Sequence, residues 1–547
     1  MTHTGCYNKN LTKMFSRFHL ATYILLILTC LHLSTAHAQR MQFTPAKKLQ
    51  YAQGLVEKFY MEDVNSDTIV DEAIKAMLKT LDPHSLYSTA EETRELTEPL
   101  DGNFSGIGIS FNMSTDTIYV ISTIASGPSE RVGIMAGDRI IEVDDTIVAG
   151  VKMKQRDVMK RLRGKKGTRV NVKVVRNGEP KPLQFNITRD DIPIHSVEAS
   201  YMADLHTGYI RISRFAENTL SEFKEAMQSL HRQGMQNLII DLQNNTGGYL
   251  NAAYGIASLF LNNGDMVVYT EGKHSPRHNY TARHTSSFDG RIAVLVNQNS
   301  ASASEILAGA LQDHDRAVII GRRTFGKGLV QRPFPMPDGS MIRLTTARYF
   351  TPSGRSIQRP YTKGHQSDYY SDLKNRLSNG ELMHSDSIHV ADSLKYHTLT
   401  TGRIVYGGGG IMPDKFVPLD TTWFTPYYRD IMAKGIFIQY ALSYLDKNRA
   451  QLLKEYPSDR DFSQNFVVTD QMMSQLKERA EKAEIKFDSE QYAKSDATIR
   501  RTLKALLARD LYQTGSYYLV DNQHEPVYNE ALSIINNKKE YNKLLGI

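Results

Sequence analysis

The chain has 547 residues, of which 41% are hydrophobic and 23% charged, a balance that fills the cores of several domains and excludes a disordered or collagen-like protein. The formal net charge of +7 is small for this length and argues against a protein built to bind nucleic acid. Both cysteines lie within the first 30 residues, which excludes a disulfide framework and a thiolate zinc site for the rest of the chain.

The N-terminus has the order of a secretory signal. Basic residues precede an apolar run at 21–33, and an A-x-A cleavage pattern follows at 36–38, so we predict a signal peptide over 1–38. The apolar run is shorter than the roughly 20 residues that cross a bilayer. We therefore expect an exported mature chain without a stable membrane span. An uncleaved anchor and a lipoprotein modified at Cys30 are the alternatives.

Hydrophobic periodicity predicts two different regions before residue 191. Residues 42–98 have helical spacing, broken at 81–85, where a proline disfavours the helical conformation for the residue before it. Residues 99–190 are rich in glycine and alternate between apolar and polar positions, which predicts a β-rich domain. Its expected strands include 118–121, 139–143 and 169–175, with one short helix at 155–162.

The rest of the chain is predicted to be an α/β core followed by helices. Strands alternate with helices through 191–418, as in a layer built of crossover units. A polar stretch at 360–406 interrupts this core as an insertion or mobile flap, and 419–547 is helical. The expected core strands are 208–212, 237–242, 292–297 and 317–320, and the expected helices are 220–233, 250–261 and 304–312.

A run of small polar residues, SASASEI at 300–306, follows one of these strands and opens a helix. A serine such as Ser302 at this turn lies where backbone N–H groups converge and where the helix dipole favours developing negative charge. That position suits a nucleophile and its oxyanion. The alternative is an ordinary serine cap of a helix.

The segment TFGKGLVQ at 324–331 supplies a second chemical group. One helix and one strand separate it from the serine run, a path that can return Lys327 to Ser302. Burial lowers the pKa of a lysine, and a neutral lysine can act as the general base of a serine. Gln331 lies an even number of positions from Lys327, so on an extended segment both face one side, where a glutamine oxygen can orient the amine. The alternative is a surface lysine in a glycine turn.

The third element is LIIDLQNNTGG at 238–248, a buried strand that ends in a glycine pair. Glycines present N–H groups to a ligand without side chains in the way, so Gly248 and Ala303 can supply the two halves of an oxyanion hole. The alternative is a simple strand-to-helix turn. His314 cannot complete a Ser-His-Asp triad, because one helix of about 1.5 Å per residue puts it roughly 18 Å from Ser302. No histidine has metal-ligand spacing, so we expect no metal. A serine activated by a lysine needs no cofactor, so we expect none.

These motifs together resemble the C-terminal processing peptidases, also called tail-specific proteases, which are Ser-Lys serine proteases with an internal PDZ domain. The resemblance covers residues 70–415 and also rests on LDPHSLYS (81–88), GIGI (106–109) and GPSERVGIMAGDRIIEVDD (127–145). It implies that Ser302 is the nucleophile, Lys327 the general base and Gln331 the residue that orients the lysine. The backbone N–H groups of Gly248 and Ala303 would form the oxyanion hole.

Two features depart from the family pattern. The glycine-pair motif reads QNNTGG where the family more often has RGNPGG, which bears on the support of the hole. The insertion at 360–406 lengthens the segment between IQ (357–358) and GIMPD (410–414), which is usually short in the family. The implied domains are a PDZ domain at 99–190 and a serine protease core at 191–418, between the helical regions 42–98 and 419–547.

The resemblance also implies how a substrate is bound. Gly106-Ile107-Gly108-Ile109 would be the carboxylate loop of the PDZ domain, with Val158 and Leu162 lining its groove. The expected partners are protein substrates with apolar free C-termini, and the expected compartment is the periplasm. The C-terminal helices would either mediate a homo-oligomer or cover the core. A PDZ scaffold that binds tails without cleaving them, and an acyl-CoA hydrolase or isomerase, are the alternatives from other functional classes.

Overall fold

The computed structural model describes residues 44–113, 116–124 and 126–547, so the predicted signal peptide over 1–38 lies outside the described residues. The chain divides into two compact units, Met1–Met77 and Leu78–Ile547. The first contains α2 (Pro45–Phe59) and most of α3 (Ser66–Lys79). Thr44 caps α2, and none of the α2 side chains is buried. Among the described residues, no helix combines the length and apolar character needed to cross a membrane.

The second unit is built around a mixed sheet of mostly parallel strands, in the order β10-β11-β12-β15-β16-β21. β10 is antiparallel to β11, and the other neighbours are parallel. β12 and β15 are buried along their whole length, as expected for strands with both faces covered. The bounds are β10 (Val197–Met202), β11 (Thr207–Ile212), β12 (Asn237–Asp241), β15 (Ile292–Val296), β16 (Val318–Gly321) and β21 (Lys415–Phe416).

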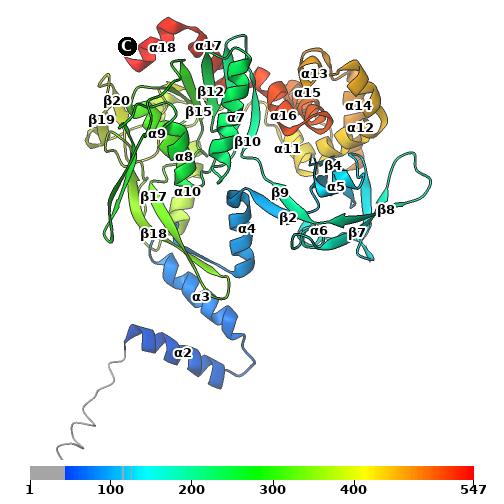
Figure 1. Cartoon of the computed structure of the whole chain (residues 1–547), viewed down its shortest axis with the longest axis horizontal. Helices are drawn as coiled ribbons and strands as arrows, with labels where there is room; N and C mark the ends of the chain where they lie inside the picture. Colours follow the sequence, from blue (N-terminus) through cyan, green and yellow to red (C-terminus); the bar gives the residue numbers. More distant parts are fainter. Residues whose placement is uncertain (1–43, 114–115, 125) are drawn as a thin grey trace, which may run out of the picture. The chain divides into compact units, whose positions relative to one another are not determined.

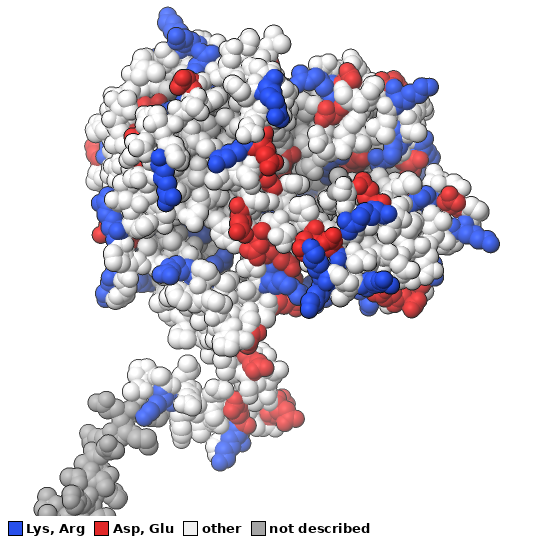
Figure 2. Space-filling model, viewed as in Figure 1, with Lys and Arg blue, Asp and Glu red and all other residues white. Residues whose placement is uncertain are grey.

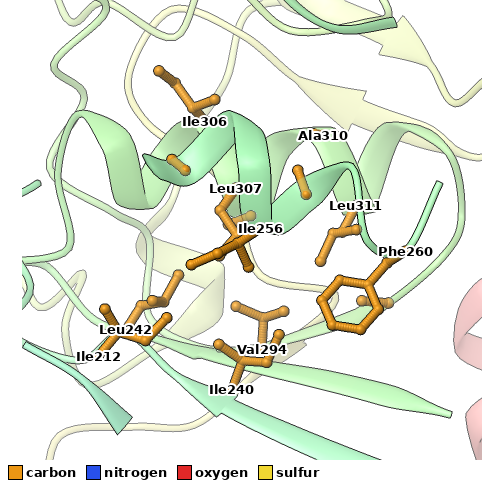
Figure 3. Packing of buried hydrophobic residues seen from close by; sticks show 14 of the residues in the cluster. Ile212, Ile240, Leu242, Ile256, Phe260, Val294, Ile306, Leu307, Ala310 and Leu311 are labelled. Carbon is orange, nitrogen blue, oxygen red and sulfur yellow. The ribbon is translucent and has the colours of Figure 1, made fainter. Parts of the chain in front are cut away.

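Alternate residues of these strands pack against different helices, because successive side chains of a strand point to opposite faces. Ile240 and Val294 face the cluster that includes Leu307 and Phe260 (Figure 3). Ile239 and Leu295 pack with the C-terminal helices instead. The first face is covered by α7 (Thr219–Arg232), α8 (Leu250–Ala257) and α9 (Ala303–Asp313), and the second by α17 (Pro526–Asn536) and α18 (Lys538–Leu545) (Figure 1).

The predicted core elements are present with small shifts at their ends. The helix expected at 250–261 ends at Ala257, because the N–H groups of Leu259 and Phe260 bond carbonyls three residues back and tighten the chain into turns. The last helices of the chain cover the sheet, which is one of the two roles expected of the C-terminal region. A homo-oligomer formed by this region stays a prediction.

A second sheet is antiparallel and joins distant segments in the order β1-β18-β13-β14, with β17 also paired to β18. The predicted helical region 42–98 is therefore not wholly helical, since β1 lies within it and pairs with β18. No local pattern reveals such a long-range pairing. The strand bounds are β1 (Leu86–Ser88), β13 (Met266–Gly272), β14 (Ser275–Thr281), β17 (Leu329–Pro335) and β18 (Met341–Phe350). The helix that follows β1 is α4 (Ala90–Asp101).

The polar insertion at 360–406 is packed against the core and does not form an open flap. Its helix α10 (Gln366–Ser378) buries Tyr369 and Arg376. The Arg376 guanidinium donates to the main-chain oxygen of Thr324 at 3.0 Å and pairs with Glu381. A few buried anchors hold a segment whose average composition is polar. Its short strands are β19 (Lys395–His397) and β20 (Ile404–Tyr406).

The β-rich region holds a sheet in the order β3-β4-β5-β7-β8, and β2 pairs separately with β9. Buried aliphatic side chains such as Ile118, Val143 and Val172 fill its interior. Its elements are β2 (Asn103–Gly106), β3 (Ile109–Asn112), β4 (Ile118–Thr123), α5 (Pro128–Arg131), β5 (Arg139–Val143), β6 (Thr146–Ile147), α6 (Gln155–Leu162), β7 (Arg169–Val175), β8 (Leu183–Thr188) and β9 (Asp190–Pro193).

The C-terminal region adds a helical layer with its own apolar core. Its helices are α11 (Pro426–Ala433), α12 (Ile436–Glu455), α13 (Asp459–Asn465), α14 (Asp470–Lys482), α15 (Ser489–Leu511) and α16 (Thr514–Asp521). The predicted fold class is confirmed: an α/β core, an inserted β-rich domain and helical regions at both ends. On the face shown in Figure 2, basic and acidic side chains are interspersed.

Candidate active site

Two strand-to-helix turns meet at the carboxyl edge of the parallel sheet, after β12 and after β15. The Asn297 side chain joins them, because its Oδ1 accepts from the Asn244 N–H at 3.0 Å and its Nδ2 donates to Asn244 Oδ1 at 3.0 Å. The N–H of Ala301 donates to the Asn245 carbonyl, also at 3.0 Å. These contacts fix the glycine-pair turn against the serine run.

Ser302 lies at the N-terminus of α9 in a strained backbone conformation. Its φ of 56° and ψ of −112° lie outside the regions that residues with a Cβ usually adopt. Such strain persists where surrounding contacts hold the residue, and it is concentrated at functional sites. The Ser302 N–H donates to Glu305 Oε2 at 2.8 Å, which is one of those contacts.

The glycine pair lies directly against the serine. A Cβ added to Gly247 would be 2.8 Å from the Ser302 Cβ and 3.1 Å from the Ala303 nitrogen. Gly248 has φ of 144° and forms a bridge to Phe215, where a Cβ would be 2.1 Å from the Phe215 carbonyl oxygen. The structure thus brings the predicted oxyanion-hole segments together around Ser302, and only glycine fits at either position.

Lys327 is held close to Ser302 by contacts of the main chain. The buried Glu305 carboxylate accepts from the Ser302 N–H and, at 2.9 Å, from the Lys327 N–H. It also accepts from the Gly326 N–H at 2.7 Å and the Thr324 hydroxyl at 2.5 Å. Burial raises the pKa of Glu305, but these four donors favour its ionised form. One side chain, that of Glu305, therefore sets the spacing between the turn at Ser302 and the segment that contains Lys327.

Tyr349 of β18 makes a second connection between the same two residues. Its hydroxyl lies 2.6 Å from the carbonyl oxygen of Lys327 and 3.2 Å from that of Ser302. The Tyr349 side chain is almost fully buried. Glu305 and Tyr349 thus bind opposite polar groups of one pair of residues, the N–H groups and the carbonyl oxygens.

The Lys327 amine is in an environment that favours its neutral form. Burial, and after it the charge of the nearby Arg343, lowers the pKa of Lys327 to about 8, against the opposite effects of Glu305 and Asp82. An ordinary lysine has a pKa of about 10.4 and is almost wholly protonated at neutral pH. A pKa of about 8 makes the free amine available as a general base near neutral pH.

Gln331 makes no hydrogen bond with Lys327 in the described part of the chain. Its Nε2 donates to the Leu329 carbonyl and to Thr345 Oγ1, each at 3.2 Å. Lys327 also precedes the first residue of β17, so the even spacing along an extended segment does not apply to this pair. The orienting role of Gln331 stays a prediction. Among the described residues, no hydrogen bond joins the side chains of Ser302, Lys327 and Gln331 to one another.

The histidine near the candidate site is His84 and not His314. His314 directly follows the last residue of α9, and its Nε2 lies 2.7 Å from the Met266 carbonyl oxygen. His84 Nε2 lies 3.0 Å from the Tyr369 hydroxyl. Burial, followed by the charge of Lys327, lowers the pKa of His84 to about 3, so it is neutral. In the described ranges, no cluster of three or more histidine, cysteine or acidic residues could hold a metal ion.

Sequence reasoning assigned no role to Glu305, Tyr349, Asp82 or His84. Glu305 belongs to the motif SASASEI, and Asp82 and His84 belong to LDPHSLYS. The presence of Glu305, Asp82 and His84 in these motifs indicated that they matter, but their contacts depend on how the chain folds and could not be predicted. Tyr349 belongs to ARYFTPSGRSIQRP at 347–360, a segment that extends the family resemblance, but no role was assigned to it.

The predicted carboxylate loop lies between β2 and β3. The Ile107 carbonyl accepts from the Ser129 N–H at 3.0 Å and from its hydroxyl at 2.6 Å, and Gly108 has φ of 74°. β3 is an end strand of its sheet, so its second edge is available for pairing in the described residues. Val158 and Leu162 are buried in the core of this domain, and their contact with a peptide stays a prediction.

Comparisons with known proteins agree with this layout. A family model for "Peptidase family S41" matches residues 206–370, and a model for "PDZ domain" matches 105–187. A model for "Activating protease CtpB N-terminal domain" matches 30–93. Residues 427–513 match a family of unknown function.

Several curated proteins are similar to this chain. It is 37% identical over 314 residues to a "Probable CtpA-like serine protease" of Staphylococcus epidermidis, covering 57% of this chain and 63% of that protein. It is 37% identical over 304 residues to a "Carboxy-terminal-processing protease" of Bartonella bacilliformis, covering 55% and 69%. With "Carboxy-terminal processing protease CtpB" of Bacillus subtilis the identity is 32% over 381 residues, covering 68% and 79%. The match thus spans less than two thirds of the Staphylococcus protein.

Proposed function

The chain belongs to peptidase family S41, with the carboxy-terminal processing proteases, and from this premise we propose that it is a serine endopeptidase that acts on protein substrates bound by their C-terminal tails. The observation that carries the proposal is the joint binding of Ser302 and Lys327 by Glu305, with the pKa of Lys327 lowered to about 8. A lysine with a structural role does not require a lowered pKa, whereas a lysine that acts as a general base near neutral pH does.

The proposed reaction uses the residues of this chain alone. Neutral Lys327 takes the proton of the Ser302 hydroxyl while Oγ attacks the scissile carbonyl carbon, and the oxyanion is bound by the N–H groups of Gly248 and Ala303. Protonated Lys327 then gives its proton to the leaving amine, and the peptide bond breaks to leave an acyl-enzyme. Water attacks the ester with Lys327 again as base, which releases the acid and restores the serine.

The available edge of β3 supports tail capture by the PDZ domain. A peptide that pairs with this strand gains main-chain hydrogen bonds, and its terminal carboxylate would meet the loop 106–109. Charge-assisted hydrogen bonds of this kind contribute about 1.5–3 kcal/mol. We expect amidation of the substrate C-terminus to raise KM roughly 10-fold and to change kcat less, measured by steady-state cleavage. Equal KM values for acid and amide would contradict tail capture by its carboxylate.

Export to the periplasm is also proposed, on the order of basic, apolar and small residues at the N-terminus. The test is N-terminal sequencing of the protein recovered from the periplasmic fraction, where a chain beginning at Gln39 is expected. A chain that keeps residues 1–38 would favour the anchor.

The activity is tested with the chain from Gln39 onward, as wild type and as Ser302→Ala, on an unfolded protein that ends in an apolar free carboxylate. We expect new peptides by mass spectrometry with the wild type only. Cleavage by both proteins would contradict Ser302 as nucleophile. Tail binding without cleavage by the wild type would indicate a scaffold, and thioester hydrolysis that survives in Ser302→Ala would indicate an acyl-CoA hydrolase.

A further inference from the structure

A turn at 81–85, buried from Asp82 to Ser85, lies against the strand that contacts Gln331. The Asp82 carboxylate at its centre accepts from the His84 N–H at 2.9 Å and from the Ser85 N–H at 3.1 Å. It also accepts from the Ser85 hydroxyl at 2.5 Å and from Thr345 Oγ1 at 2.9 Å. Asp82 is only 7% exposed. A carboxylate with this many donors is fixed in place, so it offers a rigid acceptor to Thr345.

The chemistry of these groups fixes the direction of each hydrogen bond. Ionised Asp82 only accepts, so the Thr345 hydroxyl gives its single hydrogen to Asp82. Thr345 Oγ1 is then left to accept, and it does so from Gln331 Nε2 at 3.2 Å. The Leu329 carbonyl, which also only accepts, takes the second N–H of the same amide at 3.2 Å. Both N–H groups of Gln331 are thereby occupied.

Such a fixed amide presents its oxygen, and not its nitrogen, on its remaining side. An amide oxygen can accept from the Lys327 amine without adding a full charge, whereas an amide nitrogen there would compete as a donor. β18 also contains an extra residue, Thr346, opposite the step from Val330 to Gln331. Bulges of this kind redirect side chains and are common beside active sites.

We propose that Asp82 is a positioning residue for the Ser302–Lys327 site, which acts through Thr345 to fix the orientation of the Gln331 amide. The inference rests on the proposed protease function and assigns a role to the motif LDPHSLYS. Asp82 and Thr345 are 263 positions apart in the chain. The turn is thus a part of the active-site support that is contributed by the region before the PDZ domain.

The insertion at 360–406 holds the other side of this turn. The Tyr370 hydroxyl donates to the Pro83 carbonyl at 2.9 Å, and Gln366 Nε2 donates to the Asp82 carbonyl at 3.1 Å. Both residues belong to α10. The turn is thereby bound by β18 on one side and by the insertion on the other, which gives the insertion a structural task in the same support.

Asp82 also contributes its charge to the surroundings of Lys327. Its carboxylate favours the protonated amine and so raises the pKa of Lys327, against the larger effects of burial and of Arg343. Removal of this charge lowers the pKa. The titratable and charged groups that face Lys327 are Glu305 of α9, Arg343 and Tyr349 of β18, and Asp82 and His84 of the turn.

The orientation is tested with Thr345→Val against Thr345→Ser in the chain from Gln39 onward. Valine removes the hydroxyl and keeps the shape, so we expect kcat to fall roughly 10- to 100-fold with KM changed less than about 2-fold. Serine restores the relay and brings kcat within about 3-fold of wild type. Thr346→Val is the matched control, since within the described residues its hydroxyl has no hydrogen bond, and it is expected to keep kcat. Equal kcat for Thr345→Val and Thr345→Ser would overturn the proposal.

The charge is tested separately with Asp82→Asn, which keeps an oxygen for the two backbone N–H groups and for Thr345. We expect the acid limb of kcat/KM to move to lower pH, and the limb of Arg343→Gln to move to higher pH. An Asp82→Asn limb at the wild-type position would contradict the charge effect. Circular dichroism and thermal unfolding show whether each variant is folded. A wild type that does not cleave, or a Ser302→Ala variant that does, would instead refute the proposed function itself.

Discussion

The two halves of the candidate site are held in different ways. The half with Ser302, Gly248 and Ala303 lies at two strand-to-helix turns after parallel strands of one sheet, and each turn follows its strand directly. The half with Lys327 and Gln331 lies on a loop and a strand edge, and its support comes from other segments. The strands of the sheet position the residues of the first half, whereas contacts with segments distant in the sequence position those of the second.

Glu305 is the residue that joins the halves. It belongs to the helix of the first half by sequence, yet it binds the N–H groups of Gly326 and Lys327 in the second. The comparison teaches that Lys327, the base of this site, is held in place through its main-chain N–H, which Glu305 accepts. The side-chain amine is not needed to position the residue and is left free for chemistry.

The largest effect is expected from a substitution that removes the general base of the second half and leaves the first half unchanged. Lys327→Arg keeps the length and the positive charge of the side chain, but a guanidinium does not lose its proton in proteins. We expect kcat to fall by roughly 10³-fold or more, as for loss of a catalytic base, with the fold unchanged by circular dichroism. Lys327→Met should be as inactive as Lys327→Arg. An arginine variant with substantial turnover would show that the positive charge, and not the base, is what matters.

Glu305→Gln tests the connection between the halves. A glutamine amide offers one acceptor in place of two, so buried N–H groups of Ser302 or Lys327 lose their partners, at a cost of about 1–3 kcal/mol each. We expect lower stability in urea unfolding and a fall in kcat of roughly 100-fold.

The matched control is Glu222→Gln, because Glu222 also accepts from several donors, at Ser196, Val197 and Asn218. It should lose stability but keep its kcat per folded molecule. Equal kcat losses in both variants would mean that Glu305 acts only through stability.

This contrast also explains how much could be predicted from the sequence. Ser302 and Gly248 were found because a buried strand, a small-residue turn and a helix follow one another locally. Lys327 was found because one helix and one strand can return it to Ser302, and the resemblance to known proteases then assigned its role. Thr345 and Asp82 were not found, since their contact joins segments 263 positions apart. The even spacing used for Gln331 assumed an extended backbone that begins only at Leu329.

A smaller effect tests the first half. Gly247→Ala and Gly234→Ala place a Cβ at similar positive φ values, 103° and 94°, and each should cost stability through backbone strain of about 1 kcal/mol. Only at Gly247 would the new Cβ lie against Ser302. We expect kcat to fall roughly 10- to 100-fold for Gly247→Ala alone. Unchanged turnover in Gly247→Ala would place the oxyanion elsewhere.

The central claim, that neutral Lys327 activates Ser302, is tested most directly by the pH dependence of kcat/KM for the wild-type chain from Gln39 onward. Because the protonated amine cannot accept a proton, the rate is expected to rise with pH and to level off above a pKa of about 8, the value to which burial lowers that of Lys327. The profile should have unit slope on its acid side, measured on a substrate whose own charge does not change in this range. A rate that stays constant from pH 6 to 9 would contradict the account.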